Sequence, residues 1–534
     1  MIRDDLASAV HDSLAALGVD PLPERVSLER PARPEHGDWS TNVALAVAKR
    51  AGRNPRELAT QLVDHLRAAP PAHVTEVELA GPGFVNFRLA PAWLHDVLTD
   101  VVERGVDGYA APDLGHGIIV NVEFVSANPT GPVHAGHARG AAHGDALARL
   151  LERTGHVVTR EFYVNDRGVQ MEKFGASLAA RKAGKALPED GYRGEYVTEW
   201  AEAMPDGVDP VAWGEDRSLA DQEEALDAFG VHFDRWFREL AMVENGAIDA
   251  TLAELLDRGA AYVDDGATWL RSTDHGDDKD RVLVKSDGEY TYLLPDIAYH
   301  RDKFSRATKL INVWGADHHG YVVRMKAAMA ALGHDPAELE VEIVQMVDLL
   351  QDGEPMKLSK RAGTVVELRD IVDEVGADAA RLTYLLQSID SRQTVDLAAV
   401  ASEGMDNPVF YVQMAHARIH GITRKAADAG FTRGPLADAD LSLLVHDREL
   451  DVLRCLSELP DVVRLATADR APHKVTTWVR DLAGAFHGFY HDCYVVGDGV
   501  TVELTQARLW LVESARIGLS IGLDLLGVSA PESM

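Results

Sequence analysis

The feature that most constrains the fold is a strand, a glycine-bearing turn, a helix and a second strand in direct succession. The first run, IIVNVEFVSA at 118–127, is apolar and β-branched, and NPTGPVHAGHARG leads from it into the helical run AAHGDALARLLERTG. VVTREFYV then supplies the second strand. This order predicts a βαβ unit, in which both strands lie parallel in one sheet.

The alternation of strands and helices continues further along the chain. Apolar runs at 308–317 and 341–350 are predicted strands, and the amphipathic segment between them is a predicted helix. Such alternation predicts an α/β fold with a doubly wound, mostly parallel sheet of the Rossmann type. An acidic and helical insertion over about 170–290 is expected to interrupt the sheet. From about residue 370 the pattern is helical only, which predicts a bundle.

The chain of 534 residues is too long for one ordinary domain, so several parts are expected. Residues 1–100 have the pattern of a small α+β domain, with two strands joined by a Gly-Pro-Gly turn. The Rossmann-like domain is predicted over 115–375, including the insertion. A helical connection at 376–404 and an all-α bundle at 405–534 follow.

The tetrapeptide His134-Ala135-Gly136-His137 stands between the first predicted strand and its helix. One interpretation is a zinc pair, because side chains three residues apart share a helix face, although no third ligand stands near in sequence. A second is two ordinary histidines with structural partners. A third is a nucleotide site, where Gly136 allows close approach and the helix N-terminus and imidazoles donate hydrogen bonds to phosphate. The tetrapeptide alone does not decide between them.

A second cluster, Lys357-Leu358-Ser359-Lys360-Arg361, lies in a predicted loop. A solvated basic loop is the ordinary meaning of such a cluster. However, only 13 of the 53 basic residues in the chain are lysines, so two within four positions are unusual. Two flexible ammonium groups suit the β- and γ-oxygens of a pyrophosphate leaving group.

The net charge is −32, from 85 acidic and 53 basic residues. Salt screens the resulting self-repulsion, which favours adaptation to a high-salt cytoplasm over a merely acidic enzyme. The charge opposes a generally basic nucleic-acid surface. There is no membrane-length apolar run, no secretory pattern at the N-terminus, and no CxxC pair among the two cysteines. We therefore expect a cytoplasmic protein with no membrane partner and no zinc ribbon.

Taken together, and about 220 residues apart, the two clusters resemble the HIGH and KMSKS motifs of class I aminoacyl-tRNA synthetases. The blocks VEFVSANPTGPVHAGHARG, TREFYVNDRG, GEYTYLLPDIAYH and VWGADHHGYVVRMKAA resemble the arginyl-tRNA synthetase family within that class. HGDWSTNVA and GPGFVNF resemble its N-terminal tRNA-contacting domain, and NPVFYVQMAHARI resembles the start of its anticodon-binding domain. The resemblance covers essentially the whole chain, with Ala135 in place of the generic isoleucine.

This resemblance implies ligation of L-arginine to tRNA(Arg) through an arginyl-adenylate, with ATP and Mg²⁺ and with activation that requires bound tRNA. The histidines and lysines of the two motifs would stabilise the phosphates as charge develops on them. The residues implied for ATP binding and catalysis are His134, Gly136, His137, Lys357, Ser359 and Lys360. A monomer is expected.

The resemblance also implies an arginine site. Carboxylates and a phenol are natural acceptors for the five donors of a guanidinium group. The alignment of one position is ambiguous, because Asp317 stands beside His318. The implied arginine contacts are Glu123, Asn128, Tyr292, Asp296 and His318. The candidate tRNA contacts on one predicted helix are Arg418, Arg424 and Lys425.

Three alternatives remain at this level, and one of them, an acidic structural or chaperone-like protein, is supported only by the net charge. A class I synthetase for another amino acid, such as cysteine or glutamate, would need zinc-binding thiols or a basic pocket, and Glu123 and Asp296 argue against the latter. A non-catalytic tRNA-binding relative would be expected to have lost motif residues, whereas both histidines and both lysines are present.

Overall fold

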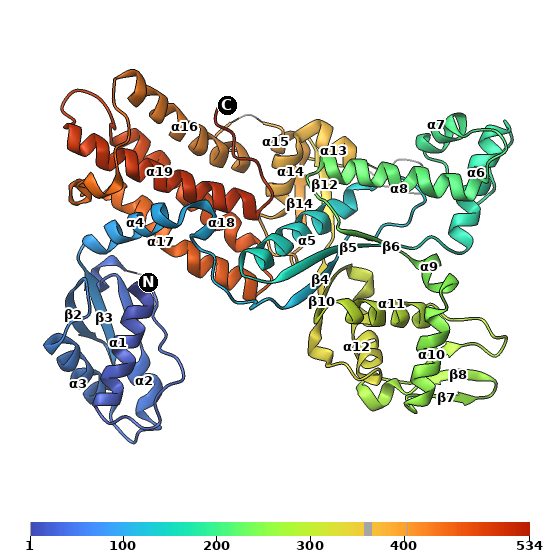
Figure 1. The fold of residues 1–534 in the computed structure, drawn as a ribbon, viewed down its shortest axis with the longest axis horizontal. Coiled ribbons are helices and arrows are strands. Elements are labelled where there is room, and N and C mark those ends of the chain that lie inside the picture. Colours follow the sequence, from blue (N-terminus) through green and yellow to red (C-terminus); the bar gives the residue numbers. More distant parts are fainter. Residues whose placement is uncertain (1, 32, 357–365, 403) are drawn as a thin grey trace. The chain divides into compact units, whose positions relative to one another are not determined.

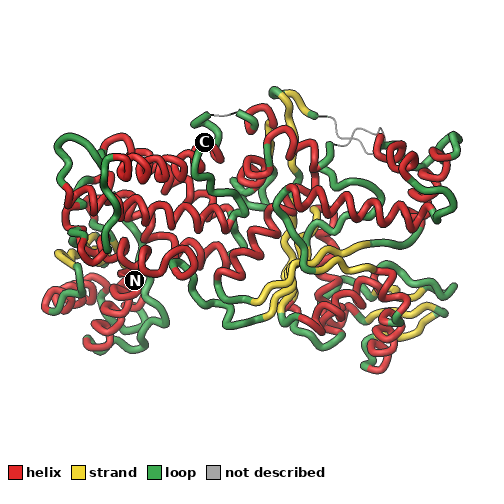
Figure 2. Tube along the Cα trace, turned by 45° about the horizontal axis from the view of Figure 1, so that its top comes forward, coloured by secondary structure: helices red, strands yellow, loops and turns green. Residues whose placement is uncertain are grey.

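The computed structural model describes residues 2–31, 33–356, 366–402 and 404–534. The chain forms two compact units. Unit 1 comprises Met1–Arg104, Lys425–Ser457 and Gly488–Ser514, and unit 2 comprises Gly105–Arg424, Glu458–His487 and Ala515–Met534. Helices make up most of the described chain, and the strands form small separate sheets (Figure 2).

The N-terminal part of unit 1 is a small α+β fold, as predicted. Its elements are α1 (Ile2–Ala16), β1 (Trp39–Thr41), α2 (Val43–Ala48), α3 (Pro55–Ala68), β2 (Val74–Ala80), β3 (Phe84–Leu89) and α4 (Ala92–Gly108). The sheet order is β1-β3-β2, and both pairs are antiparallel. The hairpin closes where Ala80 faces Phe84, so the predicted Gly-Pro-Gly turn is confirmed. Gly105 has φ +62° and breaks α4 near its end, next to the boundary of unit 1.

Unit 2 is built on a five-stranded sheet in the order β11-β10-β4-β5-β6, and every pair in it is parallel. The strands are β4 (Ile119–Glu123), β5 (Val157–Val164), β6 (Arg235–Arg238), β10 (Lys309–Gly315) and β11 (Leu339–Val344). From β4 the chain adds strands first on one side and then on the other. The predicted doubly wound parallel sheet is therefore confirmed, with its change of direction between β4 and β10.

Helices cover both faces of this sheet (Figure 1). Helix α5 (Ala135–Arg153) lies over one face, and α11 (Leu293–Arg306) and α12 (Val322–Ala331) lie on the other. Small residues allow α5 to approach the sheet closely, because Ala138, Ala142 and Ala146 are fully buried. A Cβ at Gly144 would overlap the ring of Phe124, which follows β4. This close packing fixes the start of α5 at the end of β4.

The predicted insertion at 170–290 differs from the expected helical insertion in two ways. It contains β6, a strand of the main sheet, and it contains an antiparallel sheet of β7 (Ala261–Asp264), β8 (Ala267–Leu270) and β9 (Arg281–Val284). Short strands of four residues carry too little periodicity to be recognised in a helical context. The helices of this region are α6 (Val169–Lys182), α7 (Glu195–Ala203), α8 (Pro210–Ala228), α9 (Glu239–Glu244) and α10 (Ala247–Asp257).

The predicted single strand at 341–350 is wrong. The chain leaves the main sheet after β11, and β12 (Val347–Gln351) pairs with β13 (Glu354–Pro355) and with β14 (Gln393–Asp396). A continuous apolar run carries no sign of where it changes from one sheet to another. Between β13 and β14 the chain forms the helices α13 (Leu368–Val375) and α14 (Ala377–Tyr384). Helix α15 (Leu397–Val400) follows β14.

The C-terminal region is helical, as predicted. It contains α16 (Pro408–Asp428), α17 (Asp447–Ala468), α18 (His473–Asp492) and α19 (Val502–Leu525). Each of these four helices has residues in both units, because the boundaries between the units fall inside the helices. Across the residues that the structure describes, no helix combines the length and the apolar character that crossing a membrane requires.

Candidate active site

A large cavity opens at the carboxyl ends of the parallel strands in unit 2, with a volume of about 1560 Å³. Its wall includes the end of β4 and the turn after it, the segments after β5 and β6, and the end of β10. In doubly wound sheets, ligands bind where the strand order reverses, outside the carboxyl ends of the strands. The cavity lies at that place. Among the predicted site residues, Glu123, Asn128, His134, His137, Tyr292, Asp296 and His318 line it.

The two histidines of the first motif lie together at the start of α5. His134 is the N-cap residue, and its Nδ1 accepts a hydrogen bond from the Gly136 N–H at 3.1 Å. The rings of His134 and His137 stack with their centroids 3.9 Å apart. A Cβ at Gly136 would come within 2.9 Å of the His134 ring, so Gly136 is needed for this histidine position as well as for the predicted close approach of a nucleotide.

The second motif, with Lys357, Ser359 and Lys360, lies outside the described residues. The segment that follows it is anchored beside the first motif. The Ala135 N–H donates to the Val366 carbonyl at 2.8 Å, and the Leu368 N–H donates to the Val133 carbonyl at 2.8 Å. The chain that leaves the lysine motif thus runs antiparallel to the turn that carries His134.

A chain of buried polar groups joins β4 to α11. The Lys303 ammonium, which is fully buried, donates to Glu123 Oε2 at 2.6 Å and to Asn312 Oδ1 at 2.8 Å. The Asn312 amide lies 2.8 Å from His300 Nε2, and His300 Nδ1 lies 2.8 Å from the Asp296 carbonyl. Burial, reinforced by Lys303, lowers the pKa of His300 far below its usual range, so the ring is neutral and donates from Nδ1.

Asp296 faces the cavity from the first turn of α11. Its Oδ2 accepts a hydrogen bond from the Tyr321 hydroxyl at 2.5 Å. Burial, together with the nearby carboxylates of Glu239 and Glu123, raises the pKa of Asp296 to about 7, although the hydrogen bond from Tyr321 acts in the opposite direction. A carboxylate whose ionisation is suppressed by burial gains most from a ligand that brings a positive charge.

Glu239 is a second acidic group in the same wall. It follows β6 directly, and burial raises its pKa although Arg167 lies 3.4 Å from it. The aromatic rings of Tyr163 and Tyr299 pack at a centroid distance of 4.4 Å beside it in the cavity wall. Carboxylates next to aromatic faces match a planar guanidinium group, which pairs with the former and stacks on the latter.

The other predicted arginine contacts lie at the rim. Asn128 donates to Gln170 Oε1 at 2.9 Å, so its amide is engaged by α6. Tyr292 precedes α11 by one residue and stands one turn before Asp296, but its side chain is 90% exposed. Asp317 and His318 both line the cavity from a short 3-10 helix at Ala316–Tyr321, and the structure therefore does not choose between them.

Two arginines in the cavity wall are already paired. Arg217 lies 3.4 Å from Asp221 and stacks over the Trp200 ring, and Arg369 lies 3.5 Å from the same Asp221. Cations that are held in this way carry little uncompensated charge toward a phosphate.

The candidate tRNA contacts lie on α16, as predicted, but not with equal exposure. Arg418 Nη1 lies 2.9 Å from His487 Nδ1 on α18, so its head group is engaged between two helices. Arg424 and Lys425 are exposed. Within the described ranges, no group of three or more His, Cys, Asp and Glu side chains is arranged to hold a metal ion.

Sequence reasoning missed the residues that complete the acidic pocket, namely Tyr163, Glu239, Tyr299, His300, Lys303, Asn312 and Tyr321. A signal for some of them existed. Asp296, His300 and Lys303 recur at intervals of four and three, which places them on one helix face. The sequence does not single out Glu239, because the four-residue strand before it lies in a segment whose pattern predicts helices.

Three family models match the chain in sequence order. "Arginyl tRNA synthetase N terminal domain" matches residues 2–89, and "tRNA synthetases class I (R), catalytic domain" matches residues 102–190 and 218–421. "DALR anticodon binding domain" matches residues 412–534. The catalytic-domain match leaves out 191–217, which contains α7 and the start of α8.

Curated relatives match over the full length of the chain. A protein of Frankia alni named "Arginine--tRNA ligase" is 47% identical over 553 residues and is matched over 100% of this chain and 99% of its own length. One of Geobacillus thermodenitrificans with the same name is 44% identical, with the same coverage. The solved structure of Thermus thermophilus arginyl-tRNA synthetase superposes with a TM-score of 0.78 at 24% identity, over 100% of both chains, and so shares the fold.

Proposed function

This chain belongs to the arginyl-tRNA synthetase family and ligates arginine to tRNA, and we propose that the cavity at the carboxyl edge of the parallel sheet is where it does so. The observation that carries this proposal is the convergence, in one cavity, of the His134–His137 pair with the acidic pocket around Asp296. The first is suited to phosphate and the second to a guanidinium group.

Arginine is bound with its guanidinium group toward Asp296 and Glu239. The tyrosines of the cavity wall supply a surface for the planar group, and the two carboxylates supply its charge. Glu123 remains a proposed arginine contact, but its Oε2 is bound by Lys303 at 2.6 Å, so it is less available than Asp296. Tyr292, Asn128 and His318 are proposed to contact the substrate from the rim.

ATP is bound at the start of α5 by His134, Gly136 and His137. Lys357, Ser359 and Lys360 are proposed to complete this site, which the anchoring of Val366 on Ala135 supports. Mg²⁺ would arrive with ATP, held by phosphates and water, and would neutralise phosphate charge. This fits the described residues, which offer no acidic cage for a metal ion.

The reaction needs positioning and charge stabilisation and no covalent enzyme intermediate. The arginine carboxylate attacks the α-phosphorus of ATP, the bond to the β-phosphate oxygen breaks, and pyrophosphate leaves with the electron pair. The terminal ribose hydroxyl of tRNA then attacks the carbonyl carbon of the adenylate, and AMP leaves. The imidazoles at the start of α5 donate to phosphate oxygens during the first step.

The assay is ATP–pyrophosphate exchange with each of the amino acids, with and without total tRNA. Exchange with arginine alone among them, dependent on tRNA, is the expected outcome. Exchange with another amino acid would overturn the proposed pocket, and its absence with all of them would overturn the proposed function.

The surroundings in which the enzyme works are a further part of the proposal. The net charge of −32, with 40 arginines to 13 lysines, supports activity in a high-salt cytoplasm.

We propose a monomer that contacts tRNA through the N-terminal part, and through α16 by way of Arg418, Arg424 and Lys425. The predicted divisions at 1–100, 115–375, 376–404 and 405–534 stand as proposed domains.

A further inference from the structure

One buried guanidinium group in unit 2 holds four segments together. Arg381, on α14, has a side chain only 1% exposed. Its Nη1 donates to the carbonyls of Phe229 at 3.2 Å and Gly230 at 2.9 Å, and its Nε and Nη2 donate to the carbonyl of Leu526 at 3.3 and 3.1 Å. Nη2 also donates to the carboxylate of Asp145 on α5.

The three carbonyls are not arbitrary acceptors. Phe229 and Gly230 follow the last residue of α8, and Leu526 follows the last residue of α19. Carbonyls at a helix C-terminus lack partners within the helix and carry negative partial charge, so a cation there is favourable. Arg381 thus caps two helices while it pairs with a carboxylate of a third.

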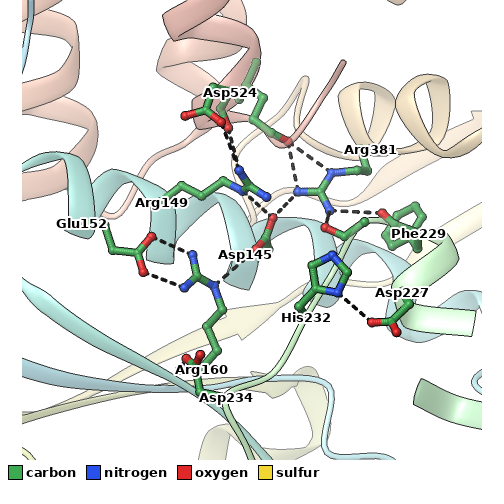
Figure 3. Close-up of polar contacts among 12 residues, drawn as sticks. Asp145, Arg149, Glu152, Arg160, Asp227, Phe229, His232, Asp234, Arg381 and Asp524 are labelled. Atoms are coloured by element: carbon green, nitrogen blue, oxygen red, sulfur yellow. Dashed lines mark hydrogen bonds and ion pairs between the residues drawn. The ribbon is translucent and has the colours of Figure 1, made fainter. Parts of the chain in front are cut away.

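Asp145 gathers further cations around the same point (Figure 3). Arg149 Nε donates to it at 2.8 Å, and Arg160 on β5 lies 3.4 Å from it. Arg149 in turn donates to a side-chain oxygen of Asp524 on α19 at 3.3 Å. Burial opposes ionisation of Asp145, yet Arg381 and Arg149 hold its pKa below the ordinary value. Helices α5 and α19 are therefore joined twice, once through Arg381 and once through Arg149.

Two of the joined helices form the proposed active site. Helix α5 begins at the His134–His137 pair. Helix α8 clamps the turn after β4, because Ser218 and Gln222 hydrogen-bond to Gly131 at distances of 2.7 to 3.1 Å. The third, α19, belongs to the C-terminal helices, which the anticodon-binding family model covers.

We infer that Arg381 is a positioning residue for amino-acid activation, which fixes α5 and α8 to the end of α19 and so makes the geometry of the ATP site depend on the C-terminal helices. This rests on the proposed function. When tRNA engages those helices, α19 sets the position of α5, and through it the position of the two histidines. Arg381 itself touches neither ATP nor arginine.

The residue that follows the Leu526 carbonyl packs directly against the Arg381 side chain. Gly527 has φ +63°, and a Cβ at this position would overlap the Arg381 guanidinium group. The carbonyl of Leu526 can approach Arg381 only because the next residue is glycine. An alanine at this position moves the end of α19 and removes no charge from the cluster.

Arg381→Lys tests the inference, with Arg160→Lys as the matched control. Both changes keep a positive charge beside Asp145, and both remove the planar fork of donors. Of these two arginines, only Arg381 donates hydrogen bonds to the C-terminal ends of α8 and α19. We would measure ATP–pyrophosphate exchange with arginine against tRNA concentration, below the melting temperature of each variant.

The expected result is a split between kcat and KM. Arg381→Lys should lower kcat at least tenfold while the KM for tRNA stays within threefold, and Arg160→Lys should leave both within threefold. Equal effects of the two variants, or a normal kcat in folded Arg381→Lys, would overturn the inference. An inactive wild-type protein would instead overturn the proposed function.

If Arg381→Lys does not fold, Gly527→Ala tests whether the position of the end of α19 controls activation. It should reproduce the loss of kcat with an unchanged KM for tRNA, because it displaces α19 from Arg381. A folded Gly527→Ala protein with wild-type kcat would overturn the inference, since the end of α19 would then have no influence on activation.

Discussion

Replacing Asp296 by asparagine should make the protein more stable and the enzyme worse. Burial among other carboxylates raises the pKa of Asp296 from 3.8 to about 7. In the unfolded chain this carboxyl loses its proton near pH 4, whereas in the fold it keeps the proton up to about pH 7. Between these values the folded state binds more protons, so stability falls as the pH rises.

The size of this penalty follows from the shift. A difference of about 3 pKa units corresponds to about 4 kcal/mol, fully present above pH 7 and absent below pH 4. Part of the carboxylate faces the cavity, so a gain of about 2 to 4 kcal/mol is expected for Asp296→Asn at pH 8, and almost none at pH 4. The Tyr321 hydroxyl can still donate to the amide oxygen, so the hydrogen bond is kept.

Arginine binding should show the opposite dependence on pH. Only the ionised form of Asp296 pairs with the guanidinium group, and with a pKa of about 7 it is ionised to about 10% at pH 6 and about 90% at pH 8. The arginine KM of the wild type should therefore fall roughly tenfold between these values. Asp296→Asn should have a KM at least about 100-fold higher and independent of pH, because the buried charge pair is lost.

Two measurements check this prediction. Denaturant unfolding at pH 4, 6 and 8 gives the stability of both proteins, and exchange kinetics give the arginine KM over the same range. Tyr321→Phe serves as a control, since loss of its hydrogen bond should raise the pKa of Asp296 and move the KM profile to higher pH. A variant that is no more stable than wild type at pH 8 would refute the argument from buried charge.

Three further predictions concern the phosphates and the salt. Lys360→Ala should lower adenylate formation by roughly 100-fold with little change in arginine affinity, and full activity in pyrophosphate exchange would contradict a role in ATP binding. Gly136→Ala should lower exchange by about tenfold at an unchanged melting temperature, because the new methyl group displaces His134; a wild-type rate would show that the histidine position is not critical. In a KCl series, aminoacylation should persist or rise into the molar range, and steep monotonic loss of tRNA affinity above about 0.1 M in a folded protein would refute the high-salt proposal.

The central sheet could be predicted because its signals are local. The strand at Ile119–Glu123, the turn and α5 follow one another without interruption, and each element has its own periodicity. The break between β11 and β12 and the short strand β6 could not be predicted, because neither leaves a mark in the pattern of apolar residues. Their positions are decided by pairing with strands far away in sequence.

The residues of the candidate site could be named from the sequence where they lie inside contiguous motifs. Glu123, His134 and Asp296 fall in blocks that resemble a known family, and the structure brings all three to one cavity. The partner of Glu123 was not predictable, because Lys303 lies 180 residues further along the chain. Contacts of this kind arise from the packing of α11 on the sheet and not from any local sequence signal.

The hydrogen bonds of the buried Arg381 also constrain the order in which the chain can finish folding. The main sheet and α5 are complete in sequence before residue 345, yet the carbonyl of Leu526 that satisfies Arg381 lies 145 residues beyond it. The Ser529 N–H, further still, donates to Asp378 at 3.0 Å. At ordinary rates of synthesis, the buried arginine waits on the order of 10 s for the Leu526 carbonyl. The main sheet therefore depends on a stretch that is synthesised well after it, and a protein cut off at residue 404 would leave this buried cation without the Leu526 carbonyl, which accepts two of its hydrogen bonds.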